Sequence, residues 1–421
     1  MRALVAFLWS GFSVLAGALG AGPSVPPFSF PRLAQAQRWA TEDPGIGIVA
    51  GALGVWKGLR ARSGWAIFLG LIGIALGARR LKGRDAANRV MANALRDGLG
   101  VGWQRAIPPA THLAFGQMSR ADLWGPLRHL PLDGSREALD VVFATPDGYP
   151  LYLDVYEPPA LSSEANPSPQ ANPSLNPSPQ AGRDLRHPAV IVVAGGERGA
   201  AAHTLRCRWL AAQGHVVFAV DYRRAALWPA PLADVKCAIR WVKLNATRYR
   251  VDPGRVALMG RWLGGHLALM AAYTANDATV PASCFANDSI DDEVAAVIAN
   301  GAPTDLRPGR GVLGIVVAQL MGGPADEMPA AYAQASPVTH ARSGLPPTLL
   351  IHGQRDAVVL PTHAEWMANE LRAAGCAVVL LRVPGARHGA DSFVTGVTVP
   401  MIQYDVDRFL AWALRRDEQA S

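Results

Sequence analysis

The chain is poor in charged residues and in cysteine, and both shortages limit what it can be. Asp, Glu, Lys and Arg make up only 17% of the 421 residues, while apolar residues make up 50%, so membrane segments must be considered first. The net charge is +7, but the sequence lacks the long Lys/Arg run with interleaved aromatic residues that a nucleic-acid-binding surface would need. We therefore expect no nucleic-acid partner.

Cysteine is scarce and widely spaced. The four cysteines are Cys207, Cys237, Cys284 and Cys376. None of them takes part in the C-x-x-C spacing that is typical of zinc and redox sites. We interpret all four as small buried apolar residues, so they do not indicate a cellular compartment. We expect neither a metal ion nor an organic cofactor.

Residues 1–90 contain several uncharged apolar runs. Residues 3–22 carry no charge and have the length of ~20 residues with which a helix crosses a bilayer; a cleaved signal peptide is the competing interpretation. Two shorter runs, residues 46–56 and 65–78, contain glycines four positions apart, which lets two helices approach closely within lipid. We expect membrane-anchoring helices here, with a glycine-rich soluble helix pair as the alternative.

Basic residues flank the last of these runs and bear on its orientation. A group of five follows the run and favours the cytoplasmic side of a membrane, whereas a group of three precedes it and opposes this assignment. We expect the domain that follows to face the cytoplasm, and residues 91–136 to form a connector or cap. The five are Arg79, Arg80, Lys82, Arg84 and Arg89, and the three are Lys57, Arg60 and Arg62.

From residue 137 onward, short β-rich runs alternate with helical stretches. This alternation predicts an α/β domain over residues 137–418, a doubly wound and mostly parallel sheet with ligands near the carboxyl ends of its strands. A Pro-Asp-Gly turn signal predicts a hairpin of the first two strands, and residues 165–180 have almost no apolar side chains to bury, so we expect a disordered loop there. The predicted strands are 138–145, 151–156, 189–193, 216–220, 256–259, 295–299, 348–351 and 377–381, and the main predicted helices are 230–246 and 361–374.

Eight segments of this region carry a family resemblance. They are LYLDVYEPP, VIVVAGGERG, GHVVFAVDYRRA, DVKCAIRWV, VDPGRVALMGRWLGGHLALMAA, PTDL, PPTLLIHGQRDAVV and VPGARHG. In this order and at about this spacing they resemble the α/β-hydrolase esterases related to hormone-sensitive lipase and to bacterial feruloyl esterases, over about residues 138–415. The resemblance implies the α/β-hydrolase fold and an activity of the carboxylesterase or lipase type.

In that family the catalytic serine stands at the centre of G-x-S-x-G, on a tight turn between a strand and a helix. The matching segment here runs from Gly260 to Gly264 and reads GRWLG, so the resemblance puts Trp262 at the nucleophile position. An indole has one N–H donor and no nucleophilic atom, so it cannot form an acyl-enzyme. No other G-x-S-x-G occurs in the chain, and we interpret the nearest downstream serines, Ser283 and Ser289, as loop residues.

The resemblance implies that the other two members of a catalytic triad are present. It puts the acid at Asp356, within GQRDAVV, and the base at His388, within PGARHG. In a working triad the aspartate orients the imidazole, and the imidazole takes the proton of the nucleophile. The alternative interpretation is a hydrogen-bonded pair that has been retained for structure alone.

The predicted oxyanion hole also departs from the family pattern. Where the family carries His-Gly-Gly-Gly, this chain has Ala194, Gly195, Gly196 and Glu197. Because backbone N–H groups bind the oxyanion, the amides of Gly195, Gly196 and Leu263 are still expected to form the hole. The carboxylate of Glu197 would oppose the developing negative charge.

Departures at two separate catalytic elements favour a membrane-anchored pseudo-esterase, which binds a small acyl ester, a lipid or a protein partner without hydrolysing it. The alternative is an active ester hydrolase that uses Asp356 and His388 with a substitute nucleophile or an activated water. A third explanation is an active parent sequence altered at position 262. The sequence is silent on acyl chain length and on oligomeric state.

Overall fold

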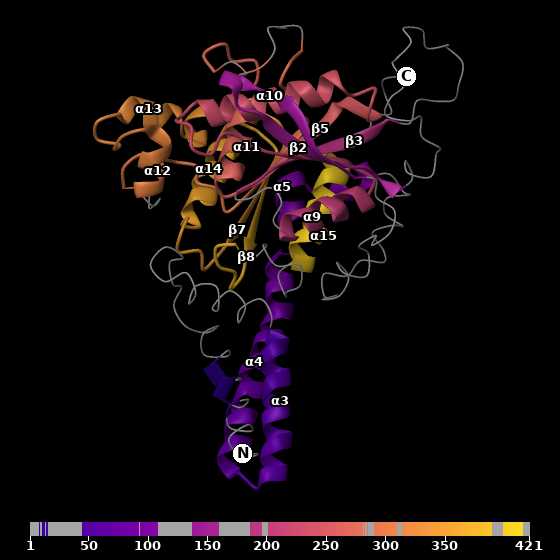
Figure 1. Ribbon diagram of the computed structural model, residues 1–421, viewed down its shortest axis with the longest axis vertical. Coiled ribbons are helices and arrows are strands. Elements are labelled where there is room, and N and C mark those ends of the chain that lie inside the picture. Colours follow the sequence, from indigo (N-terminus) through magenta and orange to yellow (C-terminus); the bar gives the residue numbers. More distant parts are fainter. Residues whose placement is uncertain are drawn as a thin grey trace.

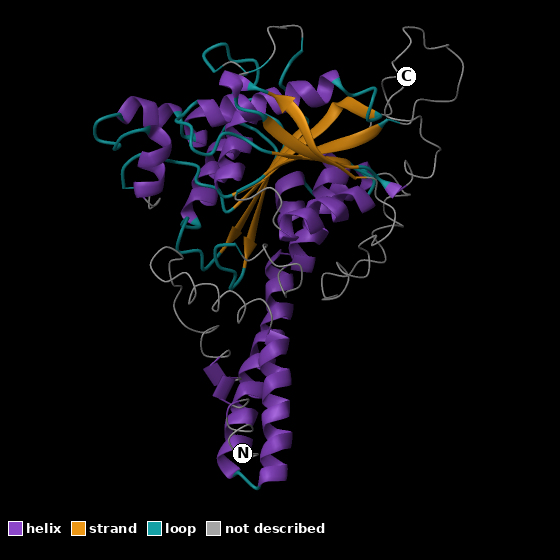
Figure 2. Ribbon diagram, in the orientation of Figure 1, coloured by secondary structure: helices purple, strands orange, loops and turns teal. Residues whose placement is uncertain are grey.

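The centre of the computed structural model is a sheet of eight strands with helices on both faces (Figure 2). The strand order is β1-β2-β4-β3-β5-β6-β7-β8. The pairs β1–β2 and β2–β4 are antiparallel, and all the others are parallel. This sheet confirms the expected α/β-hydrolase fold. The structure describes residues 44–107 except 92, 137–159, 186–195, 201–280, 290–309, 314–389 and 399–415, with a few single positions between them.

Each predicted strand corresponds to a strand of this sheet. β1 (Glu137–Ala144) and β2 (Leu151–Tyr156) form the expected hairpin around the Pro-Asp-Gly turn. The largest difference is in β5, which begins at Val251, before the apolar run from which it was predicted. The other strands are β3 (His187–Val193), β4 (Val216–Val220), β5 (Val251–Arg261), β6 (Ala296–Asn300), β7 (Thr348–Gly353) and β8 (Val378–Val383).

Two hydrophobic cores lie on the two faces of the sheet, because successive side chains of a strand point to opposite faces. On one face, Ile191 and Phe218 share a core with α10, α11 and α14. On the other, Val190 and Val217 share a core with α5, α9 and α15. The helices are α5 (Ala94–Leu99), α9 (Ala201–Ala212), α10 (Ala230–Leu244), α11 (Leu263–Tyr273), α14 (Thr362–Ala373) and α15 (Val399–Ala413), with α12 (Gly314–Met321) and α13 (Pro329–Gln334) beside them.

Part of the stretch expected to be a connector or cap belongs to the core of the sheet domain. α5 and the 3-10 helix η1 (Trp103–Ala106) bury Leu95 and Trp103 in the same cluster as α15. At Gly98 an added Cβ would lie 2.5 Å from a backbone oxygen of β8, so no larger residue fits there. Residues 108–136 and the Asn/Pro/Ser stretch 165–180 lie outside the described residues.

The N-terminal apolar runs form two helices, α3 (Pro44–Ala61) and α4 (Gly64–Met91), which lie side by side and project from the sheet domain (Figure 1). Their backbones approach closely, since a Cβ added at Gly70 would lie 2.8 Å from the carbonyl oxygen of Gly51. Within the described residues, no helix combines the length and the apolar character needed to cross a membrane. Most of the first apolar run, residues 3–22, lies outside the described part of the chain.

The cysteines correct one interpretation of the sequence. Cys237, on α10, forms a disulfide with Cys284, and their Cα atoms lie 5.5 Å apart. Cys207 is a buried free thiol, as expected, whereas Cys376 is only half-buried. Reading all four as buried apolar residues is therefore wrong for the bonded pair. Spacing alone cannot reveal this pair, because the fold brings α10 against a segment 47 residues further along the chain.

Candidate functional site

Four neighbouring strands bring the predicted triad positions to one edge of the sheet. β5, β6, β7 and β8 are consecutive neighbours and run parallel, so their carboxyl ends meet at that edge. Trp262 follows β5, Asp356 follows β7 and His388 follows β8. Three residues that are far apart in the sequence therefore lie close together.

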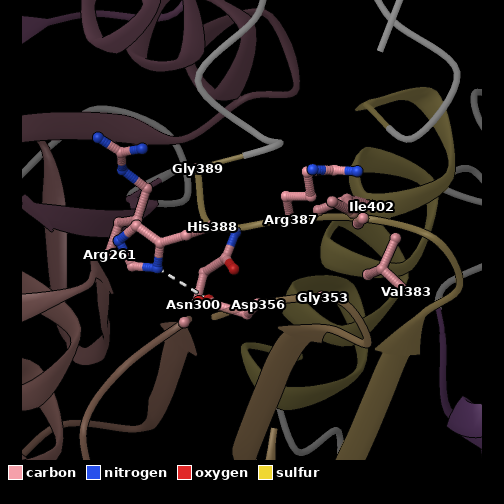
Figure 3. A pocket seen from close by; sticks show the side chains of 11 residues that line it. Arg261, Asn300, Gly353, Asp356, Val383, Arg387, His388, Gly389 and Ile402 are labelled. Carbon is pink, nitrogen blue, oxygen red and sulfur yellow. Dashed lines mark hydrogen bonds and ion pairs between the residues drawn. The ribbon is translucent and has the colours of Figure 1, made fainter. Parts of the chain in front are cut away.

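Asp356 is almost fully buried, and both of its carboxylate oxygens accept hydrogen bonds. Oδ1 accepts from the backbone N–H groups of Val358 (2.9 Å) and Val359 (3.0 Å). Oδ2 accepts from Nδ1 of His388 at 2.8 Å, the contact that is dashed in Figure 3. Burial by itself would raise the pKa of this carboxyl, but the adjacent imidazoles of His352 and His388 outweigh burial and hold its pKa below the usual range. The carboxylate is therefore ionised and fixes the orientation of the His388 ring.

His388 is arranged as a general base would be. Its Nδ1 faces a carboxylate, which only accepts, so Nδ1 carries the proton and the neutral ring presents Nε2 as the basic atom. The side chain is 17% exposed, so it is accessible to solvent. This arrangement has the geometry of the acid and the base in a catalytic triad. A full triad would also need a hydroxyl or thiol within reach of Nε2.

Trp262 forms the turn between β5 and α11. Its backbone has φ 51° and ψ −120°, a positive φ that residues with a bulky side chain rarely adopt. Its N–H donates to the carbonyl oxygen of Asn300 at 2.9 Å, and its own carbonyl accepts from the N–H of His266 at 3.0 Å. This strained strand-to-helix turn is the elbow that the segment GRWLG predicts.

Glycines on both sides make the elbow tight. A Cβ added at Gly260 would collide with the carbonyl of Gly264, and one added at Gly264 would collide with the carbonyl of Val193. A Cβ at Gly195 would collide with the carbonyl of Arg261. The end of β3 therefore abuts the elbow, and only glycine fits at these three positions.

The predicted oxyanion hole is described only in part. Gly195, at the end of β3, lies next to Trp262, since its added Cβ would be 3.5 Å from the Cβ of that tryptophan. Leu263 is the first residue of α11, so its amide belongs to the unpaired N–H groups at the amino end of a helix. Gly196 and Glu197 lie outside the described residues. The assignment of the oxyanion hole stays a prediction.

The indole of Trp262 contacts the base directly. Its ring meets the imidazole of His388 edge to face, with the centroids 6.1 Å apart and the planes at 82°. In a working triad the nucleophilic hydroxyl stands beside the imidazole at this point. Here the adjacent group is an aromatic ring.

The elbow region has two depressions. A polar depression of about 310 Å³, counting space open to solvent, is shown in Figure 3, and a separate apolar pocket has about 430 Å³, counted in the same way. Trp262 lines the apolar pocket but not the polar depression, whereas His388 lines only the polar one. The polar depression includes Arg261, Asn300, Asp356, Arg387 and His388, and the apolar pocket includes Trp262, Leu306, Val317, Leu320, Val358 and Val359.

Sequence reasoning missed several residues of this edge. Asn300 and Arg387 line the polar depression, and His352 lies with Nε2 3.6 Å from Oδ2 of Asp356. A signal existed for Asn300, because it is the polar residue that ends the apolar strand AVIAN. For His352 and Arg387 the segments IHG and ARHG were quoted for the resemblance, but only the fold shows which side chains reach the site.

Known proteins resemble the domain that carries this site. Residues 178–371 match the family model BD-FAE. Esterase LipC of Mycobacterium tuberculosis is 33% identical over 221 residues, which cover 48% of this chain and 53% of that protein. Esterase LipQ of the same organism is 30% identical over 237 residues, which cover 53% of this chain and 55% of that protein. This chain thus spans about half the length of the curated relatives that it matches.

Solved structures agree with these matches. Native esterase 2 of Thermogutta terrifontis is 25% identical, covers 65% of this chain and 89% of its own, and superposes with a TM-score of 0.50. The same esterase has also been solved with propionate and with butyrate bound. The sheet domain of this chain is thus similar to α/β-hydrolase esterases, both in its fold and over part of its sequence.

Proposed function

We propose that this protein is an esterase-fold binding protein whose hydrolytic chemistry is impaired because Trp262 occupies the nucleophile position. One observation carries the proposal. The residue on the strained elbow is Trp262, and its indole lies edge to face with the His388 ring. An indole cannot attack a carbonyl carbon, so no acyl-enzyme forms on it. The apolar pocket beside the ring supports retained binding of a small acyl ester or lipid.

A second function is favoured by the other half of the site. The hydrogen bond of 2.8 Å between Asp356 and His388 supports an active ester hydrolase in which His388 activates a water molecule instead of a serine. Such an enzyme would be slow, because removing the serine of a well-studied protease lowers turnover by ~10⁶-fold and leaves ~10³- to 10⁴-fold over water. The rate of ester cleavage therefore separates the two functions.

The decisive experiment measures hydrolysis of p-nitrophenyl butyrate by the purified full-length protein, beside a His388→Ala variant and a serine-directed fluorophosphonate probe. We expect no labelling and no hydrolysis above the variant. Hydrolysis that disappears in His388→Ala without labelling would establish the water mechanism instead. Stoichiometric labelling of any serine would overturn both proposals, and peptide mapping would identify the substitute nucleophile.

We further propose that the α3–α4 hairpin attaches the protein to a lipid surface. Large apolar side chains on both helices are exposed, although glycines hold the helices close together. Aromatic residues near the turn of the hairpin are suited to the region between headgroups and acyl chains. The exposed apolar residues are Val49, Trp56, Leu59, Trp65, Phe68 and Leu71.

Vesicle flotation tests the attachment. We expect full-length protein to float with vesicles that contain anionic lipid, and the double variant Leu59→Glu and Leu71→Glu to stay largely in the unbound fraction. The matched control is Leu244→Glu, because Leu244 is an equally exposed leucine at the end of α10, outside the hairpin. Equal flotation of the hairpin variant and the control would contradict the proposal.

A separate test determines on which side of the membrane the sheet domain lies. The basic residues that follow the second apolar run, on the later part of α4, favour the cytoplasm, whereas the disulfide between Cys237 and Cys284 supports an oxidising compartment. We propose the oxidising side, because whether a disulfide forms depends on the compartment more directly than a charge bias does. Alkylation of denatured, unreduced protein taken from cells should label Cys207 and Cys376 only. Labelling of Cys237 would restore the cytoplasmic assignment.

A further inference from the structure

The polar depression lies at the carboxyl ends of β6, β7 and β8 and is separate from the apolar pocket. Asn300 ends β6, Gly353 ends β7 and Val383 ends β8, and all three line the depression. Trp262 and Leu263 line the apolar pocket and not the depression. A ligand of the depression would therefore differ from the acyl ester or lipid of the proposed function.

One largely buried side chain of this depression has its polar group available for a ligand. Asn300 is only 8% exposed. Its backbone carbonyl accepts from the N–H of Trp262, but its side-chain amide makes no hydrogen bond to the part of the chain that the structure describes. Figure 3 shows this amide between the side chains of His388 and Arg387. Because burying an amide without hydrogen bonds is costly, its two N–H donors point to a bound ligand or water.

The charged side chains around the amide favour a negative ligand. Among the described lining residues, Arg261 and Arg387 each carry a positive charge, and Asp356 carries the one negative charge. Both carboxylate oxygens of Asp356 already accept hydrogen bonds from the chain, which disfavours their use as ligands of a cation. The lining therefore has a surplus of one positive charge, which attracts anions. An anion also accepts hydrogen bonds, as the N–H donors of Asn300 require.

We propose that the polar depression binds a small monovalent anion of the halide type, to which the amide of Asn300 donates while Arg261 and Arg387 supply the favourable charge. The ligand is small because the segments around the depression are close together, since a Cβ added at Gly353 would lie 2.6 Å from the carbonyl oxygen of Ala386. This site goes beyond the proposed function, because its ligand contacts neither the apolar pocket nor the elbow side chain.

Chloride is the probe, and the full-length protein is titrated with it at constant ionic strength. Gluconate serves as the replaced anion because it is too large for the depression, so charge screening stays the same throughout. The line width of the ³⁵Cl resonance measures the affinity. In protein labelled with ¹⁵N-asparagine, chloride should shift the assigned side-chain resonances of Asn300 saturably, and those of the exposed Asn369, on α14, should stay in place.

Two variants and a matched control assign the binding to the depression. Asn300→Asp keeps the shape of the side chain and replaces its donor with a carboxylate, so the affinity for chloride should fall at least about tenfold, the effect of losing one hydrogen bond to a charged group. Arg261→Gln should weaken binding by about twofold to fivefold, because it removes one partly screened charge. Asn369→Asp makes the same change as the first variant outside the depression and should leave the affinity unchanged.

Equal affinities of Asn300→Asp and Asn369→Asp, or no saturable binding to the unmodified protein, would overturn the proposal. Should Asn300→Asp fail to fold, the Asn300 resonances of the unmodified protein decide, and their failure to shift would overturn the proposal as well. Ester hydrolysis by the unmodified protein would overturn the proposed function alone, since it does not alter the affinity for chloride.

Discussion

The site has two halves at the same edge of the sheet. The acid–base half consists of Asp356 and His388, and the elbow half consists of Trp262 and its neighbouring glycines. The two halves differ in how far their side chains match a catalytic triad. In the first half, every contact that orients a general base is present. In the second half, the backbone has the strained elbow geometry, and the residue at its centre is a tryptophan, which has no nucleophilic atom. The comparison teaches that the geometry of an elbow is held by backbone packing, so it persists whichever side chain it carries.

The largest expected effect comes from repairing the elbow half. Trp262→Ser puts a hydroxyl beside His388, and we expect hydrolysis of p-nitrophenyl butyrate on the order of 10³-fold above Trp262→Ala. Adding Glu197→Gly should raise the rate further, because it removes a carboxylate from the predicted oxyanion hole. The control is Trp262→Ser combined with His388→Ala, which should fall back to the level of Trp262→Ala. A folded Trp262→Ser protein without activity would mean that the acid–base half is a structural relic.

The next effect comes from breaking the acid–base half in the repaired protein. In the Trp262→Ser background, Asp356→Asn should remove most of the ~10³-fold gain, because the amide no longer holds the imidazole in the basic tautomer. Asp234→Asn is the matched control, since Asp234 is a fully buried carboxylate that pairs with Arg223 away from the site. If both variants lose activity equally, the loss reflects general destabilisation.

A smaller effect concerns stability in acid. Because the folded-state pKa of Asp356 lies below its ordinary value of 3.8, the carboxylate stabilises the fold above that value and less as pH falls below it. Between pH 6 and pH 2.5 this contribution should fall by about 1.5 to 2 kcal/mol. Urea unfolding at several pH values should therefore give Asp356→Asn a shallower pH dependence than the unmodified protein. Parallel curves would show that the carboxylate titrates normally.

The smallest expected effect isolates the elbow backbone. Trp262→Gly and Trp262→Ala both remove the indole and differ only in the Cβ, which is disfavoured at φ 51°. We expect the glycine variant to be more stable by about 1 kcal/mol, the reverse of the usual order at unstrained positions. Chemical unfolding of the two variants measures this difference. A more stable alanine variant would contradict the strained geometry.

The sequence pattern predicted most of the strands. Apolar runs of strand length must be buried, and a sheet covered by helices on both faces buries them. The elbow at GRWLG and the adjacency of Asp356 and His388 were both implied by the family resemblance. The early start of β5 at Val251 was not predicted, because residues 252–255 are polar or break strands. Val251 pairs with His187 of β3, and the regular pairing resumes only at Val256.

The sequence by itself determined the alternation of strands and helices and the lack of a nucleophilic atom in Trp262, because these depend on residue type and local spacing. The place of the elbow was implied by the family resemblance. Only the tertiary structure decided the disulfide between Cys237 and Cys284 and the place of Asn300 at the site. These features depend on which side chains from distant segments meet in space, and that is fixed by strand order and packing together.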